Sequence, residues 1–197
     1  MGKGRLEAFS DGVLAIILTI MVLELHVPSE RSRLVDLVPV LPIFASYVLS
    51  FVYIGIYWNN HHHLLHATRR VDAAVLWANL HLLFWLSLVP FTTRWMGENR
   101  FAPTPTALYG GNLLLSGFAY WLLQREIIAE QGEGSIVGRA VGADRKGKGS
   151  LLAYTLAIPL AYLNTWIAGI VYVAVALMWL IPDRRIERAL ADHAQAE

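Results

Sequence analysis

Long stretches of apolar residues constrain the fold of this chain more than any other feature of its sequence. A helix rises about 1.5 Å per residue, so roughly 20 apolar residues are needed to cross the ~30 Å hydrocarbon core of a bilayer. Four stretches have about this length: 8–27, 39–59, 72–93 and 106–124. Only 16% of the residues are charged, whereas soluble domains contain about 25%. The sequence therefore predicts an all-α, polytopic membrane protein rather than a soluble domain.

A fifth apolar stretch, 150–181, is longer than a single crossing needs. Pro159 cannot donate a backbone hydrogen bond inside a helix, and the polar pair Asn164 and Thr165 lies near the middle of the stretch. We therefore expect a tight turn at this pair and two short helices on either side of it, 150–163 and 165–181. With the four stretches above, the total is six transmembrane helices.

The distribution of positive charge agrees with six crossings. With the N-terminus inside, twelve of the 16 Lys and Arg residues fall on the cytoplasmic side and four on the outer side, as the positive-inside rule requires. With five crossings, nine Lys and Arg residues would lie on the cytoplasmic side and seven on the outer side, which is a weaker bias. We expect residues 1–182 to form one domain of a multi-pass protein in the cell membrane, with the N-terminus and the tail, 183–197, in the cytoplasm. The Gly-rich and charged segment 129–149 is expected to be a flexible cytoplasmic loop.

Composition and missing motifs exclude several classes of function. The chain has no cysteine, which excludes disulfides and cysteine-based metal sites. Its net charge of +1 argues against a nucleic-acid partner. It lacks a TVGYG filter, a Walker A loop, a GxSxG elbow and any cofactor fingerprint. We therefore expect no enzymatic activity, no catalytic residues, no cofactor and no metal site. Because Asp11 interrupts the first apolar stretch and no cleavage site follows, we also expect no cleaved signal peptide.

The first apolar stretch carries an aliphatic stripe along one face. At 100° per residue, Ile16, Ile20 and Leu23 fall within about 60° of one another. Thr19 lies beside this stripe and adds a single hydroxyl. The stripe is uncharged over the middle of the predicted crossing.

The opposite face of the same helix is polar near its cytoplasmic end. It carries Ser10 together with Glu7 and Asp11, which repel each other at i, i+4 spacing. A cation or a hydrogen-bond donor should therefore meet them. Candidates are Arg5 and the end of the second helix, 58–63, which reaches the same depth. We infer a polar network that joins the first helix to its neighbours.

The histidines allow two interpretations. His62 and His66 are spaced i, i+4, which suits two metal ligands on one helix. Neither an HExxH glutamate nor a cysteine accompanies them, so structural hydrogen bonding is favoured over metal binding. Asn79 and His81 lie deeper, in the third helix, and fit the polar network. The alternative is a membrane enzyme or a metal-binding protein centred on 61–66.

Residues 5–11 read Arg-Leu-Glu-Ala-Phe-Ser-Asp and fit the pattern RxxxFSD at the start of a first membrane helix. In this motif the chain resembles the prokaryotic branch of the transmembrane protein 175 family, potassium channels whose animal relatives act in endosomes and lysosomes. The second-helix residues Trp58, His61 and His62 and the six-helix plan match this family as well.

The resemblance implies a potassium-permeable channel whose pore is lined by the first helix of each subunit. Bulky aliphatic residues form the constriction and gate in this family, and they correspond here to Ile16, Ile20 and Leu23. Thr19 falls where the family has a hydroxyl linked to selectivity. A signature network would anchor the pore helix to the second and third helices through Arg5, Phe9, Ser10, Asp11, Trp58, His61 and His62.

The same resemblance implies an oligomer. Animal members carry two six-helix repeats and pair, so a chain with one repeat implies a homotetramer that conducts potassium and other monovalent cations across the lipid bilayer. The alternative function is a proton- or cation-coupled secondary transporter with Asp11 and the histidines as a relay. Such a transporter predicts broken helices and an inverted repeat, which the sequence does not display.

Overall fold

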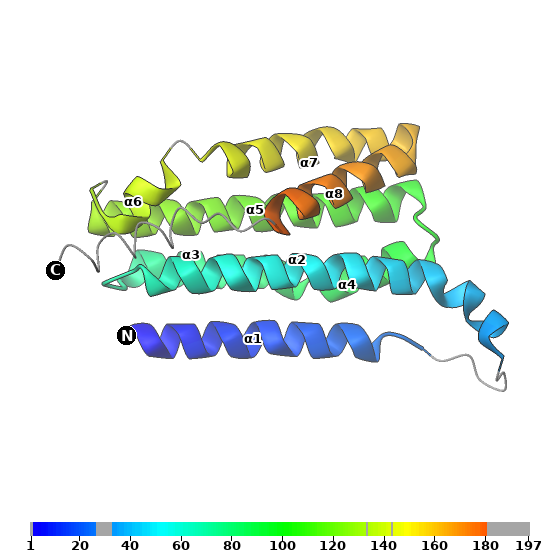
Figure 1. The fold of residues 1–197 in the computed structure, drawn as a ribbon, viewed down its shortest axis with the longest axis horizontal. Coiled ribbons are helices and arrows are strands. Elements are labelled where there is room, and N and C mark those ends of the chain that lie inside the picture. Colours follow the sequence, from blue (N-terminus) through cyan, green and yellow to red (C-terminus); the bar gives the residue numbers. More distant parts are fainter. Residues whose placement is uncertain (1, 27–32, 133, 143, 181–197) are drawn as a thin grey trace.

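The structure, a computed structural model, describes residues 2–26, 33–132, 134–142 and 144–180. Within these ranges the chain folds into helices and turns without a β-strand (Figure 1). The elements are, in chain order, α1 (Lys3–Leu23), the 3₁₀ helix η1 (Leu34–Val40), α2 (Leu41–His66), α3 (Ala73–Ser87), α4 (Val89–Glu98), α5 (Pro103–Gln131), α6 (Ile136–Val141), α7 (Arg145–Leu163) and α8 (Thr165–Leu180). The predicted tail, 183–197, lies outside the described residues.

Three stretches of the described chain are long and apolar enough to cross a membrane: Lys3–Leu23, Leu34–His66 and Ala73–Glu98. The last helix, Thr165–Leu180, is apolar but shorter. The protein is therefore an all-helical membrane protein, as the apolar stretches predicted.

The helix α1 lies along one edge of the bundle (Figure 1). It packs against α2, α3 and α4, whereas α7 and α8 form the opposite edge and α5 lies between. One face of α1 is thus covered by the rest of the bundle, and the other face has no neighbour among the described residues.

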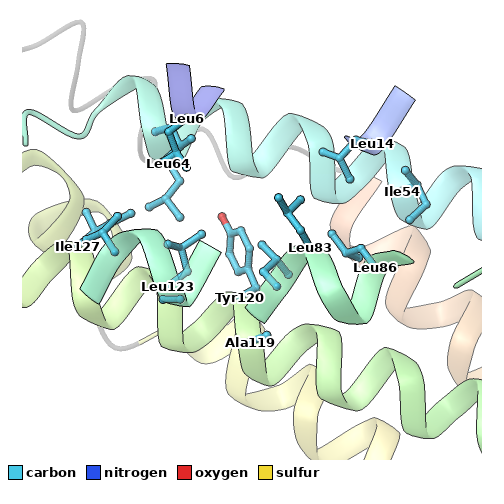
Figure 2. Close-up of a cluster of buried hydrophobic side chains, with 14 of the residues drawn as sticks. Leu6, Leu14, Ile54, Leu64, Leu83, Leu86, Ala119, Tyr120, Leu123 and Ile127 are labelled. Atoms are coloured by element: carbon cyan, nitrogen blue, oxygen red, sulfur yellow. The ribbon is translucent and has the colours of Figure 1, made fainter. Parts of the chain in front are cut away.

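Two clusters of buried side chains hold the bundle together. The first joins α1 to α2, α3 and α5, and Figure 2 shows Leu6 and Leu14 of α1 among its members. The second joins α2, α5, α7 and α8 around four tyrosines. Lipid tails are as apolar as leucine, so close van der Waals packing in the first cluster, rather than release from water, fixes the covered face of α1 on the bundle.

The structure differs from the expected helices in two places. The stretch 72–93 is divided at Leu88, because Pro90 lacks the backbone donor that a continuous helix would use. The expected loop 129–149 is partly helical: α5 continues to Gln131, and α6 follows with the Ser135 hydroxyl accepting from the Gly138 amide at 3.1 Å. Val137 of α6 is fully buried in the first cluster, so this helix packs on the bundle.

The turn expected in the last apolar stretch falls at Asn164. The helix α7 ends at Leu163 and α8 begins at Thr165. The Asn164 side chain accepts a hydrogen bond from the Trp166 amide at 2.9 Å. Pro159 lies within α7 and does not end it.

Candidate functional site

The two faces of α1 differ sharply in burial. The residues turned toward the bundle are buried: Leu6, Ser10, Leu14, Ile17 and Met21. The aliphatic stripe on the other face is exposed, with 59% of Ile16, 42% of Ile20 and 78% of Leu23 accessible. Exposing large aliphatic side chains in a row indicates that something outside the chain covers this face.

Thr19 is exposed beside the stripe, as the helical spacing predicted. Its hydroxyl donates to the Ile16 carbonyl at 2.9 Å. Because its only hydrogen is used in this bond, the remaining lone pairs of the oxygen are available as acceptors.

A chain of buried hydrogen bonds holds the covered face of α1. The His61 ring nitrogen Nε2 lies 2.7 Å from the Asn79 side-chain oxygen, and the Asn79 amide donates to the Ser10 hydroxyl at 3.0 Å. Ser10 in turn donates to the Leu6 carbonyl at 2.9 Å. An amide oxygen only accepts, so His61 carries a proton on Nε2 and all three bonds run in one direction. All three side chains are buried, so each depends on the others for its hydrogen bonds.

A second contact lies at the surface, next to this chain. The Trp58 indole donates to the Asp11 carboxylate at 3.0 Å, which supplies the donor that the acidic pair on α1 requires. The His62 ring stacks on Trp58, with 6.2 Å between centroids, and His66 stacks on His62 at 6.0 Å. The Glu7 carboxylate oxygen Oε1 lies 3.8 Å from the Lys3 ammonium nitrogen. This ammonium also donates to the His66 carbonyl at 2.7 Å.

The other end of α1 is held by charge. Arg94, in the middle of α4, binds the Glu24 carboxylate that follows α1, and it also contacts Glu98 at 2.8 Å. The helix is therefore tied to its neighbours at both ends and near its buried Ser10, on the covered face.

The structure does not bring every residue of the predicted network together. Arg5 and Phe9 are exposed, and the Arg5 side chain makes no hydrogen bond or ion pair with any described residue. At 100° per residue both fall within about 60° of Ile16, on the uncovered face. His62 reaches the network only through its stack on Trp58. Asn79 links the buried chain of hydrogen bonds and so belongs to the polar network, as its depth in the third helix suggested.

The described histidines, 26, 61–63, 66 and 81, do not converge on a metal-binding arrangement. Among the described residues, no group of three His, Asp or Glu side chains could hold an ion. His81 accepts from the Trp85 indole at 2.9 Å and stays apart from the buried chain. These features define a class of protein: a helical membrane protein whose N-terminal helix is anchored on one face by polar contacts and uncovered on the other.

Comparisons with known proteins place the chain within this class. The family model described as "Endosomal/lysosomal potassium channel TMEM175" matches residues 5–90. A potassium channel from Chryseobacterium sp. (strain P1-3) is 52% identical over 193 residues, covering 98% of this chain and 100% of that protein. The chain therefore belongs to the TMEM175 family.

A solved structure agrees in fold over nearly the whole chain. The crystal structure of a lysosomal potassium-selective channel TMEM175 homolog from Chamaesiphon minutus matches with a TM-score of 0.80 and 26% identity, covering 92% of this chain and 97% of the other. The endosomal/lysosomal proton channel TMEM175 from Homo sapiens is 35% identical over 96 residues, which cover 43% of this chain and 19% of the human protein.

Proposed function

We propose that this protein is a potassium-permeable cation channel, formed by four copies whose α1 helices surround a central pore. The uncovered aliphatic stripe of α1 is the observation that carries the proposal. Four edge helices around an axis would cover these stripes with one another, which no packing within one chain achieves. Potassium is the ion because the relatives that match most of the chain are named potassium channels.

The stripe would form the narrow part of the pore. Rings of Ile16, Ile20 and Leu23 offer no oxygen to replace the water around an ion, so a closed ring would exclude hydrated cations by dewetting. A small rotation or spreading of the α1 helices would widen the ring and let water and ions through. Polar contacts on the covered face, at Ser10 and Asp11, are placed to bias that movement.

Selectivity would depend on Thr19. With its hydrogen bound to the Ile16 carbonyl, its oxygen would present lone pairs toward the axis, where four copies could coordinate a partly dehydrated cation.

We infer six crossings for each chain, with both termini in the cytoplasm. Besides the three clear spans, α5 has 29 residues, α7 has 19 and α8 has 16. At 1.5 Å per residue these correspond to about 43, 28 and 24 Å, lengths comparable with the bilayer core. The orientation rests on the excess of Lys and Arg in the predicted cytoplasmic segments. We infer no enzymatic role, since the relatives are named channels.

Single-channel recording of the purified protein in a bilayer with a potassium gradient tests the proposal. Wild-type protein should give discrete current steps that reverse near the potassium equilibrium potential. Ile16→Asn should raise the leak current, because an amide wets the constriction. The matched control is Leu156→Asn, which places the same amide at an exposed position of α7, on the opposite edge of the bundle.

Two results would contradict the channel. Unchanged conductance in Ile16→Asn would remove α1 from the pore. Flux that saturates with substrate and stays far below channel rates, without current steps, would favour the proton- or cation-coupled transporter instead.

A further inference from the structure

A groove of about 490 Å³ opens beside α8, the helix that with α7 forms the edge of the bundle opposite α1 (Figure 1). Its walls come from α8, the first half of α2 and the turn between α4 and α5. None of the anchoring contacts of α1 involves its lining residues.

The floor of the groove is an apolar stripe along α8. Trp166, Ile170, Val173 and Leu177 recur at helical spacing and are all exposed. The distance from Trp166 to Leu177 along the helix is about 16 Å at 1.5 Å per residue, and one leaflet of the hydrocarbon core is about 15 Å thick. A Cβ at Gly169 would meet no atom within 4 Å, so the groove is open at this residue.

One end of the groove carries a single positive charge. Arg100 lines the groove at the end where α8 begins, and no described lining residue is acidic. The Arg100 side chain makes no hydrogen bond or ion pair with any described residue, unlike Arg94, which binds two carboxylates. The backbone at Arg100 and Phe101 has φ values of 50° and 59°, and the Phe101 amide donates to the Met96 carbonyl at 2.9 Å. This tight turn fixes the backbone at Arg100, whose side chain lines the groove at this end.

A second polar group in the groove also lacks a partner. The Thr106 hydroxyl oxygen is buried and has no hydrogen-bond partner within the described chain. Burying an unpaired hydroxyl costs about 1–3 kcal/mol, so a side-chain rotation that turned it toward an ester carbonyl in the groove would be favourable.

We propose that this groove binds an anionic phospholipid, with the phosphate at Arg100 and one acyl chain along the α8 stripe. The proposed topology places Arg100 and Trp166 at the outer membrane surface, where a basic side chain and an indole suit the headgroup region. A groove one leaflet long, with charge only at its interfacial end, matches one lipid chain and its headgroup. A second protein copy would have to place its own apolar side chains along the entire stripe and an acidic group at its end. The inference requires a membrane protein and does not depend on the pore.

Quenching of tryptophan fluorescence by lipids with brominated acyl chains tests the proposal. The full-length protein is reconstituted in phosphatidylcholine vesicles that contain equal fractions of either brominated phosphatidylglycerol or brominated phosphatidylcholine. The difference between wild type and Trp166→Phe isolates the signal of Trp166. Trp166 should be quenched severalfold more by the brominated phosphatidylglycerol.

Substitutions then distinguish recognition of the lipid headgroup from binding of the acyl chain. Arg100→Gln should abolish the preference for phosphatidylglycerol, and Arg100→Lys should restore part of it. Arg33→Gln is the control, because Arg33 lies on the same predicted side but outside the groove, beside Asp36. Gly169→Leu should reduce quenching by both lipids, since its side chain fills the groove.

Several outcomes would overturn the proposal. Equal quenching by the two lipids would exclude headgroup recognition, and an equal loss in Arg33→Gln would reduce it to general surface charge. A protein partner in the groove would give a different result. Both lipids would then quench Trp166 weakly, the particle mass would exceed that of the proposed tetramer, and Gly169→Leu would lower this mass. Quenching and particle mass do not depend on conductance. They therefore test the lipid site even if the protein proves not to be a channel.

Discussion

Asn79 shows how one buried amide can set the orientation of a whole helix. It receives a hydrogen bond from His61 on α2 and gives one to Ser10 on α1, while lying on α3 itself. No other described side chain links these three helices by hydrogen bonds on both sides. In an apolar bundle, side-chain packing holds a helix in place, and a directional chain of donors and acceptors adds a preference for one rotation about the helix axis.

Asn79→Ala should therefore destabilise the protein by about 2–4 kcal/mol, because it removes two hydrogen bonds and leaves the His61 donor buried without an acceptor. The midpoint of thermal unfolding in detergent should fall by several degrees. The control is Asn99→Ala, an exposed amide that donates only to the Trp95 carbonyl at 2.8 Å. Equal midpoints for the two variants would mean that the buried chain does not anchor α1.

The hydroxyl of Thr19 makes a prediction about selectivity. Thr19→Val keeps the shape of the side chain and removes the oxygen, so the ratio of potassium to sodium permeability should fall toward one. Reversal potentials measured with potassium on one side and sodium on the other give this ratio. Thr155→Val is the matched control, since Thr155 on α7 is exposed and makes the same kind of bond, to the Leu151 carbonyl at 2.8 Å. A ratio that is unchanged in Thr19→Val would remove Thr19 from the ion path.

At the scale of elements, α4 and α2 approach closely at Gly97. A Cβ at Gly97 would lie 2.7 Å from the Ile43 Cα, a backbone atom that cannot move aside without moving α2. Gly97→Ala should therefore destabilise the protein by about 1–3 kcal/mol through this overlap. Thermal unfolding should show the opposite sign for Gly111→Ala, where a Cβ meets nothing within 4 Å and alanine favours the helix by up to about 1 kcal/mol. Equal shifts in the two variants would contradict the close packing of α4 on α2.

Sequence periodicity predicted the faces of α1 well, because burial in a helix repeats with its turn. Ile16, Ile20 and Leu23 are exposed on one face, as their spacing indicated. The break at Asn164 could also be predicted, because it depends on polar residues next to one another in the sequence. Elements that depend on residues far away in the sequence were harder to predict. The short helix α6 places Val137 in the core, and local composition could not reveal that contact.

The polar network shows the same limit. A motif groups residues by their place in the chain, whereas hydrogen bonds follow direction around the helix. Ser10 is buried against the bundle, and the exposed Asp11 lies next to it in sequence. Arg5 and Phe9, by contrast, lie on the uncovered face of α1. The depth of Asn79 in the third helix suggested that it joins the network, but only the packing of α3 against α1 reveals that its partner there is Ser10.

At the scale of the whole molecule, the two edges of the bundle differ in what could cover them. The α1 edge carries an aliphatic stripe whose helix is tied to its neighbours by polar contacts at both ends, which suits a surface that repeated copies share. The α8 edge carries an apolar groove with one unpaired positive charge, which suits lipid. Four chains with α1 inside would place every α8 at the perimeter.

Cross-linking tests this arrangement directly, because the chain contains no native cysteine. Leu23→Cys places one thiol on the uncovered face of α1, and four copies around an axis should bring these thiols close enough to form disulfides on mild oxidation. Leu163→Cys is the control: Leu163 is 81% exposed and lies at the same predicted depth, but on the α7 edge, where copies should not meet. We expect covalent dimers for Leu23→Cys only, and a detergent-corrected particle mass of four times the 22.0 kDa chain. Cross-linking of Leu163→Cys alone, or a particle of two or three copies, would contradict a tetramer built around α1.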